Sequence, residues 1–228
     1  MNAGIYELID SGLEQRLRFD CISNNLANLS THGFKKDDIS FQEILGMEVH
    51  TKTDFSPGEI IHTGNPLDVA LEGKGFFKIQ TPMGGRYTKN GSFSLNAEQQ
   101  LMTRSGALVL GEQGPIKING KDMSIEPDGT VKVDGSPAGR LLIMTFERPE
   151  FLKKEGHSQY QYLGKEEEVS PSSAFSVKQG CVEGSNVNPT EEMIKLIQVN
   201  REFEAAQKGI QSLDDVTSKL VNDQGLIS

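Results

Sequence analysis

The 228-residue chain has no tryptophan, only two cysteines and no long run of apolar residues. Hydrophobic residues make up 36% of the chain and aromatic residues 7%, which is low for a single compact globule. We therefore expect part of the apolar surface to contact partners rather than to fill an internal core. Because no apolar run approaches the ~20 residues that a membrane span needs, no direct membrane insertion is expected.

Lysine and arginine do not cluster in the sequence, and the formal net charge is -9. Nucleic acid and anionic membrane favour basic clusters, so neither is expected as a partner. The first seven residues do not begin a basic segment followed by an apolar core, so no cleaved secretory signal is expected. The sequence is then that of a cytosolic protein, or of one exported by a route that leaves it uncut.

Motifs for catalysis and metal binding are also missing. Cys21 and Cys181 lie far apart and belong to no spacing typical of a zinc site, and no two histidines lie four residues apart on a predicted helix. Gly73-Lys74-Gly75 begins a GxG motif, but Lys78 replaces the third glycine of a dinucleotide-binding loop. We predict no catalytic residue, cofactor or metal site, and expect that the chain is not an enzyme.

The first thirty residues predict one long amphipathic helix. Asn2 can cap its start, no proline occurs before Pro57, and Gly33 is placed to end it in the left-handed conformation. Apolar or small residues recur at steps of three and four, with Gln15 in the one polar position, as in a heptad-like seam. The stripe contains Ile5, Leu8, Gly12, Phe19, Ile22, Leu26 and Leu29.

The last forty residues predict a second helix. Asn188 can cap it, Pro189 suits the first helical position and Glu191 suits the third. From Pro189 to about Val221 the helix would be ~50 Å long, and a helix of this length needs a cover for its apolar stripe. That stripe contains Met193, Leu196, Ile197, Phe203, Ala206, Ile210, Leu213, Val216 and Leu220.

Between the helices, the chain is rich in glycine and predicts short strands. Turn signals such as Asn90-Gly91 and Pro127-Asp128-Gly129 separate them, which indicates an antiparallel β domain. The predicted strands cover residues 76–80, 86–89, 92–95, 101–103, 108–110, 116–118, 123–125, 130–133 and 140–146.

The predicted fold class is α+β, with long N- and C-terminal α-helices that form a coiled-coil-like pair and a β-rich antiparallel middle domain. Two uses of the helical stripes remain open, because they can pair within the chain or bind other subunits. The expected organisation is an N-terminal helix over 1–34, a connector over 35–66, the β-rich domain over 67–163, a connector over 164–187 and a C-terminal helix over 188–228.

Three asparagines, Asn24, Asn25 and Asn28, stand close together near the end of the first predicted helix, although asparagine is a poor helix former. If they are buried between helices, each amide needs hydrogen-bond partners. A buried asparagine at a helix interface can fix its register. The alternative is a polar patch near a fraying helix end.

Residues 23–35 resemble the N-terminal signature of the bacterial flagellar axial proteins, the rod and hook family, in which Asn-Asn-Leu-Ala-Asn precedes Gly-Phe-Lys. Residues 63–77, 87–93 and 183–193 are similar to further segments of that family, in the same order. Only 21 residues separate Phe41 from Thr63, which resembles the proximal rod type rather than the distal rod or hook type.

The resemblance implies a structural subunit that assembles helically into the basal-body rod through its terminal helices, transmits torque and lines the export channel. It implies contacts with other rod proteins and with copies of itself, and export by the flagellar type III apparatus to the periplasmic rod. The alternatives are another rod-family member, such as the distal subunit, or a coiled-coil binding adaptor. The expected assembly interface comprises Ile5, Leu8, Phe19, Ile22, Asn24, Asn25, Leu26, Asn28, Leu29, Gly33, Phe34, Asn186, Asn188, Met193, Leu196, Ile197, Phe203, Ile210 and Leu213.

Overall fold

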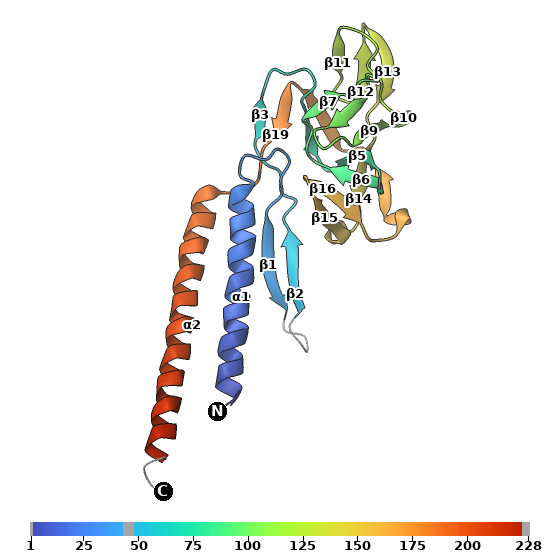
Figure 1. Ribbon diagram of the computed structural model, residues 1–228. Helices are drawn as coiled ribbons and strands as arrows, with labels where there is room; N and C mark the ends of the chain where they lie inside the picture. Colours follow the sequence, from blue (N-terminus) through green and yellow to red (C-terminus); the bar gives the residue numbers. More distant parts are fainter. Residues whose placement is uncertain (1, 43–47, 225–228) are drawn as a thin grey trace. The chain divides into compact units, whose positions relative to one another are not determined.

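The chain divides into two compact units (Figure 1). The computed structural model describes the backbone of residues 2–42 and 48–224, and the side chains of residues 12–39 and 51–212. Unit 1 contains residues 1–27, 37–52 and 188–228, and unit 2 contains residues 28–36 and 53–187. Both units are therefore assembled from segments that lie far apart in the sequence.

Unit 1 is formed by two helices and a hairpin. Helix α1 (Asn2–Ala27) lies between α2 (Pro189–Gln224) and the strands β1 (Asp37–Gln42) and β2 (Glu48–Thr53) (Figure 1). The side-chain oxygen of Asn188 accepts the backbone N–H groups of Thr190 and Glu191, at 3.1 and 3.4 Å. The predicted helix start at Pro189 is confirmed by this cap.

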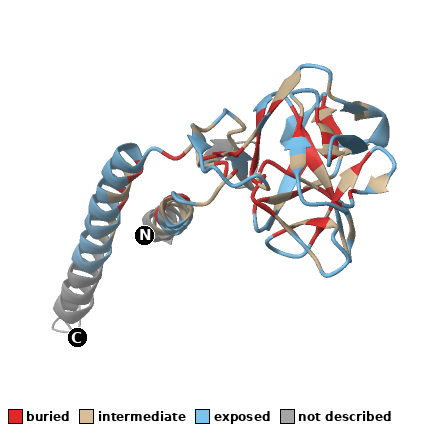
Figure 2. Ribbon diagram, turned by 90° about the horizontal axis from the view of Figure 1, so that it is seen from above, coloured by how far each residue is buried: buried red, intermediate tan, exposed pale blue. Residues whose placement is uncertain are grey.

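The predicted fold class is wrong. The described residues are rich in strands, which include a ten-stranded antiparallel sheet, and the two helices do not form a coiled-coil-like pair. Met193 and Ile197 of the predicted α2 stripe are 56% and 54% exposed, and α2 is exposed along most of its described length (Figure 2). Of the helix residues whose side chains the structure describes, the buried ones are instead Gln15, Ile22, Asn25, Glu192 and Val199. Three of these five side chains are polar, so the described part of the contact lacks the continuous apolar seam that a coiled coil needs.

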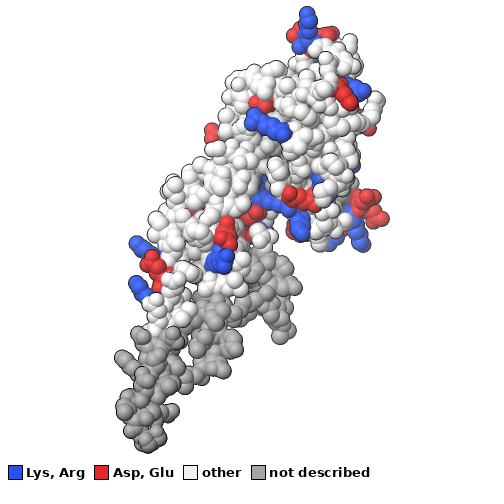
Figure 3. Space-filling view, in the orientation of Figure 1, with Lys and Arg blue, Asp and Glu red and all other residues white. Residues whose placement is uncertain are grey.

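Charged side chains on the face drawn in Figure 3 occur in small groups of both signs. Exposed ion pairs of unit 2 include Lys178 with Glu72, at 2.6 Å, and Arg140 with Glu112, at 3.6 Å. Exposed pairs of this kind contribute little to stability. Neither described helix is long and apolar enough to span a membrane.

Unit 2 is built almost entirely of short strands joined by tight turns. Its strands are β3 (Ile60–His62), β4 (Val69–Gly73), β5 (Phe76–Thr81), β6 (Gly84–Thr88), β7 (Phe93–Leu95), β8 (Leu101–Thr103), β9 (Leu108–Gly111), β10 (Gly114–Pro115), β11 (Met123–Ile125), β12 (Thr130–Val133), β13 (Ser136–Arg140), β14 (Ile143–Phe146), β15 (Leu152–Gly156), β16 (Gln159–Tyr162), β17 (Val169–Pro171), β18 (Phe175–Gln179) and β19 (Cys181–Glu183).

The largest sheet follows the path β15-β16-β6-β5-β9-β8-β7, with β10 paired to β9 and β14 paired to both β5 and β17. A three-stranded sheet has the order β11-β12-β13, and β4 pairs with β18 while β3 pairs with β19. The segments predicted as connectors therefore contain the strands β1 to β3 and β17 to β19.

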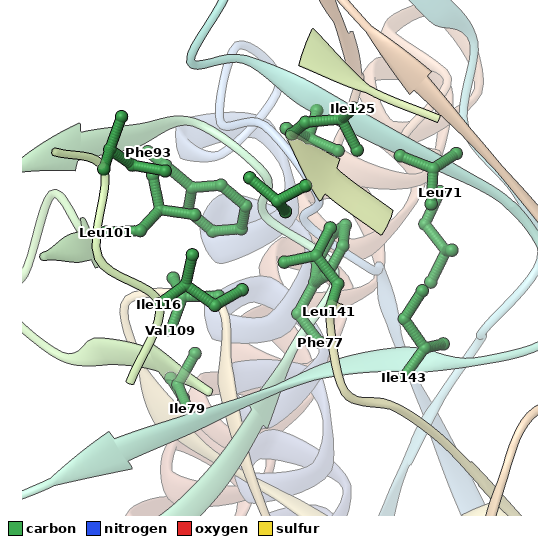
Figure 4. Close-up of a cluster of buried hydrophobic side chains, with 14 of the residues drawn as sticks. Leu71, Phe77, Ile79, Phe93, Leu101, Val109, Ile116, Ile125, Leu141 and Ile143 are labelled. Atoms are coloured by element: carbon green, nitrogen blue, oxygen red, sulfur yellow. The ribbon is translucent and has the colours of Figure 1, made fainter. Parts of the chain in front are cut away.

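The side chains of β5 alternate between two hydrophobic cores. Phe77 and Ile79 are fully buried in the larger core, where residues of the surrounding strands meet them (Figure 4). Phe76 enters a second cluster with Phe146 and Tyr160. Successive residues of a strand face opposite sides, so β5 contributes to both cores, as does β14 through Ile143 and Phe146.

Candidate assembly interface

Asn25 joins three elements of unit 1. Its side chain is 1% exposed, and its amide nitrogen donates to the Glu192 carboxylate at 3.0 Å and to the Asp37 carbonyl oxygen at 2.9 Å. Its amide oxygen accepts the Asp37 N–H at 3.0 Å. Asn25 therefore connects α1 to α2 and to β1 with both ends of its amide in use, which is the requirement for a buried polar side chain.

A lysine balances the buried carboxylate of Glu192. The Lys195 ammonium donates to Glu192 at 2.8 Å and lies 3.4 Å from Glu191 and 3.7 Å from Asp38. Partial burial acts to lower the pKa of Lys195, but the hydrogen bond to Glu192 and the three nearby carboxylates outweigh it and raise the pKa. Lys195 therefore stays charged and compensates Glu192, which is itself 1% exposed.

Apolar side chains remain uncovered on both helices. A groove of about 440 Å³ runs between Phe19 of α1 and Phe203 of α2. Gln15 lines the same groove, and its side-chain oxygen is buried without a hydrogen-bond partner among the described residues. The exposed apolar side chains of the two helices include Leu13, Phe19, Met193, Ile194, Ile197, Phe203 and Ile210.

In unit 2, residues 33–36 meet residues 183–186, and we call these two segments the clasp. The Gly33 N–H donates to the Glu183 carbonyl oxygen at 2.7 Å. The Lys36 N–H donates to the Asn186 side-chain oxygen at 2.7 Å, and the Asn186 N–H donates to the Phe34 carbonyl oxygen at 3.4 Å. The two signature segments recognised in the sequence are therefore hydrogen-bonded to each other.

A buried ion pair lies at the centre of the clasp. The Lys35 ammonium donates to the Glu183 carboxylate and, at 2.7 Å, to the Ser56 carbonyl oxygen. The Gly58 N–H donates to the same Glu183 oxygen at 3.0 Å. Both charged side chains are almost fully buried, so each depends on these partners to offset its lost hydration.

A second lysine approaches the ion pair. The Lys89 ammonium lies 3.9 Å from the other Glu183 oxygen and donates to the Gly73 carbonyl oxygen at 3.2 Å. Burial lowers the pKa of Lys89 to about 8; the negative charge of Glu183 opposes this change, and the positive charge of Lys35 adds to it. Lys35 of the clasp and Lys89 outside it therefore place two buried cations around the Glu183 carboxylate.

Gly33 is required by two independent features of the clasp. Its backbone has a φ of +65°, and a Cβ at this position would lie 2.4 Å from the backbone nitrogen of Asn90. The left-handed conformation predicted for Gly33 is confirmed. Because α1 ends at Ala27, the glycine does not terminate the helix as expected, but brings the chain against Asn90.

The structure distributes the predicted interface residues over both units. The side chains of Ile5, Leu8 and Leu213 lie outside the described part of the structure. The other predicted residues are exposed (Phe19, Asn24, Leu29, Asn188, Met193, Ile197, Phe203 and Ile210), intermediate (Leu26, Asn28, Asn186 and Leu196) or buried (Ile22, Asn25, Gly33 and Phe34).

Sequence reasoning missed Lys35, Glu183 and Glu192, because charged residues are usually exposed. One signal was available, since Lys35 and Glu183 are opposite charges and each stands in a signature segment. Among residues whose side chains are described, no group of three or more His, Cys, Asp or Glu could hold a metal ion.

Three family models match the chain. "Flagella basal body rod protein" matches residues 13–35, "Flagellar hook protein FlgE/F/G D1 domain" matches residues 70–133, and "Flagellar basal body rod FlgEFG protein C-terminal" matches residues 178–223. The first and third matches contain Asn25, Glu192 and most of the clasp.

Relatives align over nearly the whole chain. The flagellar basal-body rod protein FlgG of Buchnera aphidicola is 32% identical over 92% of this chain and 95% of its own length. The chain belongs to the flagellar basal-body rod protein family. FlgF of Mesorhizobium japonicum is 30% identical over 90% of both chains, and FlgF of Caulobacter vibrioides is 28% identical over the whole of both. This rod protein is therefore a structural subunit, most like FlgF, and the adaptor alternative is not favoured.

Proposed function

We propose that this rod protein is a non-enzymatic, proximal subunit of the flagellar basal-body rod, which assembles helically with copies of itself and with other rod proteins. The observation that carries the proposal is the apolar surface of the helices. Met193 and Ile197 lie on one face of α2 and are each more than half exposed. A face of this kind marks an interaction site, because exposed apolar side chains gain stability when another chain covers them.

The proposed mechanism is mechanical. Subunits packed through α1 and α2 transmit torque across the periplasm and line the export channel. Each Leu, Ile or Phe that becomes fully buried at a subunit contact contributes about 1.5–3 kcal/mol, so several contacts together resist torsion. We further propose that the flagellar type III export apparatus delivers the subunit without cleaving a signal peptide, and that the residues assigned to the interface from the sequence act in this assembly.

The first test is electron cryotomography of basal bodies in a strain that lacks the gene. A basal body that keeps its membrane ring but has lost the rod and all distal parts supports the proximal position. Complete rods, hooks and filaments in this strain would refute it.

A matched pair of variants tests the helical surface itself. Ile197→Glu introduces a charge on the exposed face of α2, and Met83→Glu introduces the same charge at an exposed apolar residue of unit 2. Restoring the deletion strain with Ile197→Glu should leave rods truncated, whereas Met83→Glu should restore them. Equal restoration by both variants would exclude this face of α2 from the assembly contact.

A further inference from the structure

Unit 2 contains a pocket of about 590 Å³ beside its second hydrophobic cluster. Three phenylalanine rings form its apolar wall. Phe76 lies edge-on to both Phe55 and Phe146, with 5.5 Å between ring centroids in each case. Pro57 and Pro149 complete this wall. The volume lies within the range of pockets that bind ligands or inserted side chains.

One buried cation faces this aromatic wall. Lys89 lines the pocket, is 5% exposed, and places its ammonium 5.4 Å from the centroid of Phe76. An ammonium has three N–H donors, and among the described residues only the Gly73 carbonyl oxygen lies within hydrogen-bond distance. Glu183 stands too far away for a hydrogen bond, at 3.9 Å. Lys89 therefore has donor capacity that an entering acceptor can use.

The charges around the pocket favour an acidic ligand. Lys74 is exposed at the rim, and Glu147 is the carboxylate that lines the same pocket. Together with Lys89, the lining has two cations and one anion, in a chain whose net charge is -9. A carboxylate bound between the two lysines would accept a further hydrogen bond from Lys89, and a charge-assisted bond in a buried site is stronger than one in water.

We propose that this pocket docks a peptide segment of a partner protein, which inserts an aromatic or aliphatic side chain beside the three phenylalanines and places a neighbouring carboxylate between Lys89 and Lys74. This contact lies in unit 2 and does not depend on the helical surface of unit 1. Its failure would leave the proposed rod assembly untouched, and failure of that assembly would leave this docking site untouched.

The direct test is a calorimetric titration of the full chain with the synthetic peptide acetyl-Gly-Ser-Phe-Glu-Ser-Gly-amide. Two controls replace its Phe by Ala or its Glu by Gln. We expect the first peptide to bind at least about tenfold more tightly than either control. The proposal would be overturned if all three peptides bound with equal affinity, or if none bound at peptide concentrations on the order of 1 mM. Equally tight binding of 3-phenylpropionate would also overturn it, because the pocket would then select a small acid rather than a peptide.

Variants of the chain locate the site. Lys74→Glu reverses the charge at the rim, and Lys121→Glu makes the same change at an exposed lysine outside the pocket. We expect Lys74→Glu to weaken binding of the Phe-Glu peptide about tenfold or more, and Lys121→Glu to leave it unchanged. The same loss in both variants would mean that net charge, not the pocket, determines binding.

The buried ammonium has a separate readout. Lys89→Gln should abolish the preference for Glu over Gln in the peptide, with circular dichroism confirming that the strands are retained. If this variant fails to fold, the Lys74 and Lys121 pair still decides the proposal.

The pH dependence of binding tests the charge of Lys89 in the unaltered chain. Raising the pH from 7 to 9 should weaken binding, because Lys89 loses its proton in this range. The other charged groups around it are Lys35, Glu183, Lys74 and Glu147. Unchanged binding over this range would contradict the role of Lys89.

Discussion

Asn25 and Glu192 are 167 residues apart in the sequence, yet the amide of one donates to the carboxylate of the other at 3.0 Å. This hydrogen bond connects the two helices where an apolar seam was expected. Packing of apolar side chains tolerates small shifts between helices, but a buried hydrogen bond is directional and is satisfied in few arrangements. The pair therefore specifies how α1 and α2 meet within unit 1.

Replacing Asn25 by Leu should destabilise unit 1 by about 2–4 kcal/mol, because a carboxylate oxygen of Glu192 and the N–H of Asp37 lose their partner. Urea denaturation followed by the helix signal in circular dichroism measures this loss. Asn200→Leu is the control, since Asn200 is exposed on α2 and its replacement should change stability by no more than ~0.5 kcal/mol. Equal stability of the two variants would show that the Asn25 bonds do not hold the helices.

Replacing Lys35 by Met should cost about 3–5 kcal/mol, because the buried carboxyl group of Glu183 would lose its main partner. The matched control is Lys178→Met, which breaks the exposed pair with Glu72 and should cost no more than ~1 kcal/mol. Urea denaturation followed by the strand signal compares them. The double variant Lys35→Met/Glu183→Leu should recover part of the lost free energy of unfolding. A further decrease would contradict the explanation that an unpartnered buried Glu183 causes the loss.

The lowered pKa of Lys89 should make the stability of the chain depend on pH in the alkaline range. Its pKa is about 8 in the folded chain and 10.5 in the unfolded chain, so between these values the unfolded chain binds more protons. The contribution of Lys89 to the free energy of unfolding should therefore rise with pH in this window, by up to ~1.4 kcal/mol per unit. Urea denaturation from pH 7.5 to 10.5 tests this, and Lys89→Met should remove the rise. An identical pH profile in the two chains would exclude Lys89 as its source.

Comparing alanine variants of two glycines distinguishes the cost of backbone strain from the cost of a steric clash. Gly33 and Gly64 both have positive φ, at +65° and +73°, but only at Gly33 would a Cβ meet other atoms. Gly64→Ala should cost about 1–2 kcal/mol from strain alone, and Gly33→Ala should cost a further 1–3 kcal/mol or so from the clash with Asn90. Thermal unfolding compares the two variants. A smaller cost at Gly33 would mean that Asn90 moves aside freely.

Truncation tests the boundary between the units at the N-terminal end. Removing residues 1–27 should leave the strand signal and its melting temperature unchanged, because unit 2 begins at residue 28. Removing residues 1–36 also removes Lys35 and one half of the clasp, so the melting temperature should fall by on the order of 10 °C. Circular dichroism during heating measures both. The same melting temperature in the two truncated chains would show that the clasp does not stabilise unit 2.

The sequence predicted features that neighbouring residues determine. The cap at Asn188 and the start at Pro189 are confirmed, because capping involves residues only a few positions apart. Strands β8, β11 and β12 coincide with the predicted ranges, since turn residues separate them from their neighbours. The strand predicted at 116–118 is wrong, because that segment forms an isolated bridge between Lys117 and Gln100 rather than a strand, although Ile116 and Ile118 are buried.

The sequence did not predict contacts between distant segments. Lys35 and Glu183 are 148 residues apart, and each taken alone looks like an ordinary surface charge. Glu192 likewise looked like a polar residue of the first helical turn, although it lies between α2 and Asn25. The prediction of the fold class was wrong for the same reason, because the apolar stripe of one helix does not show which side chains of the other helix will pack against it. The assembly interface and the five-part division of the chain stay predictions.

The clasp also affects the order in which the protein can be completed. A chain is made from its N-terminus, so Lys35 appears 148 residues before Glu183. Until then the contacts that Gly33, Lys35 and Lys36 make with residues 183–186 cannot form, and closing so long a loop carries an entropic cost. A chain interrupted before residue 183 can form many of the strands of unit 2 but cannot close the clasp. The clasp can therefore close only after the chain has been made beyond β19, so a closed clasp distinguishes a nearly complete subunit from an unfinished one.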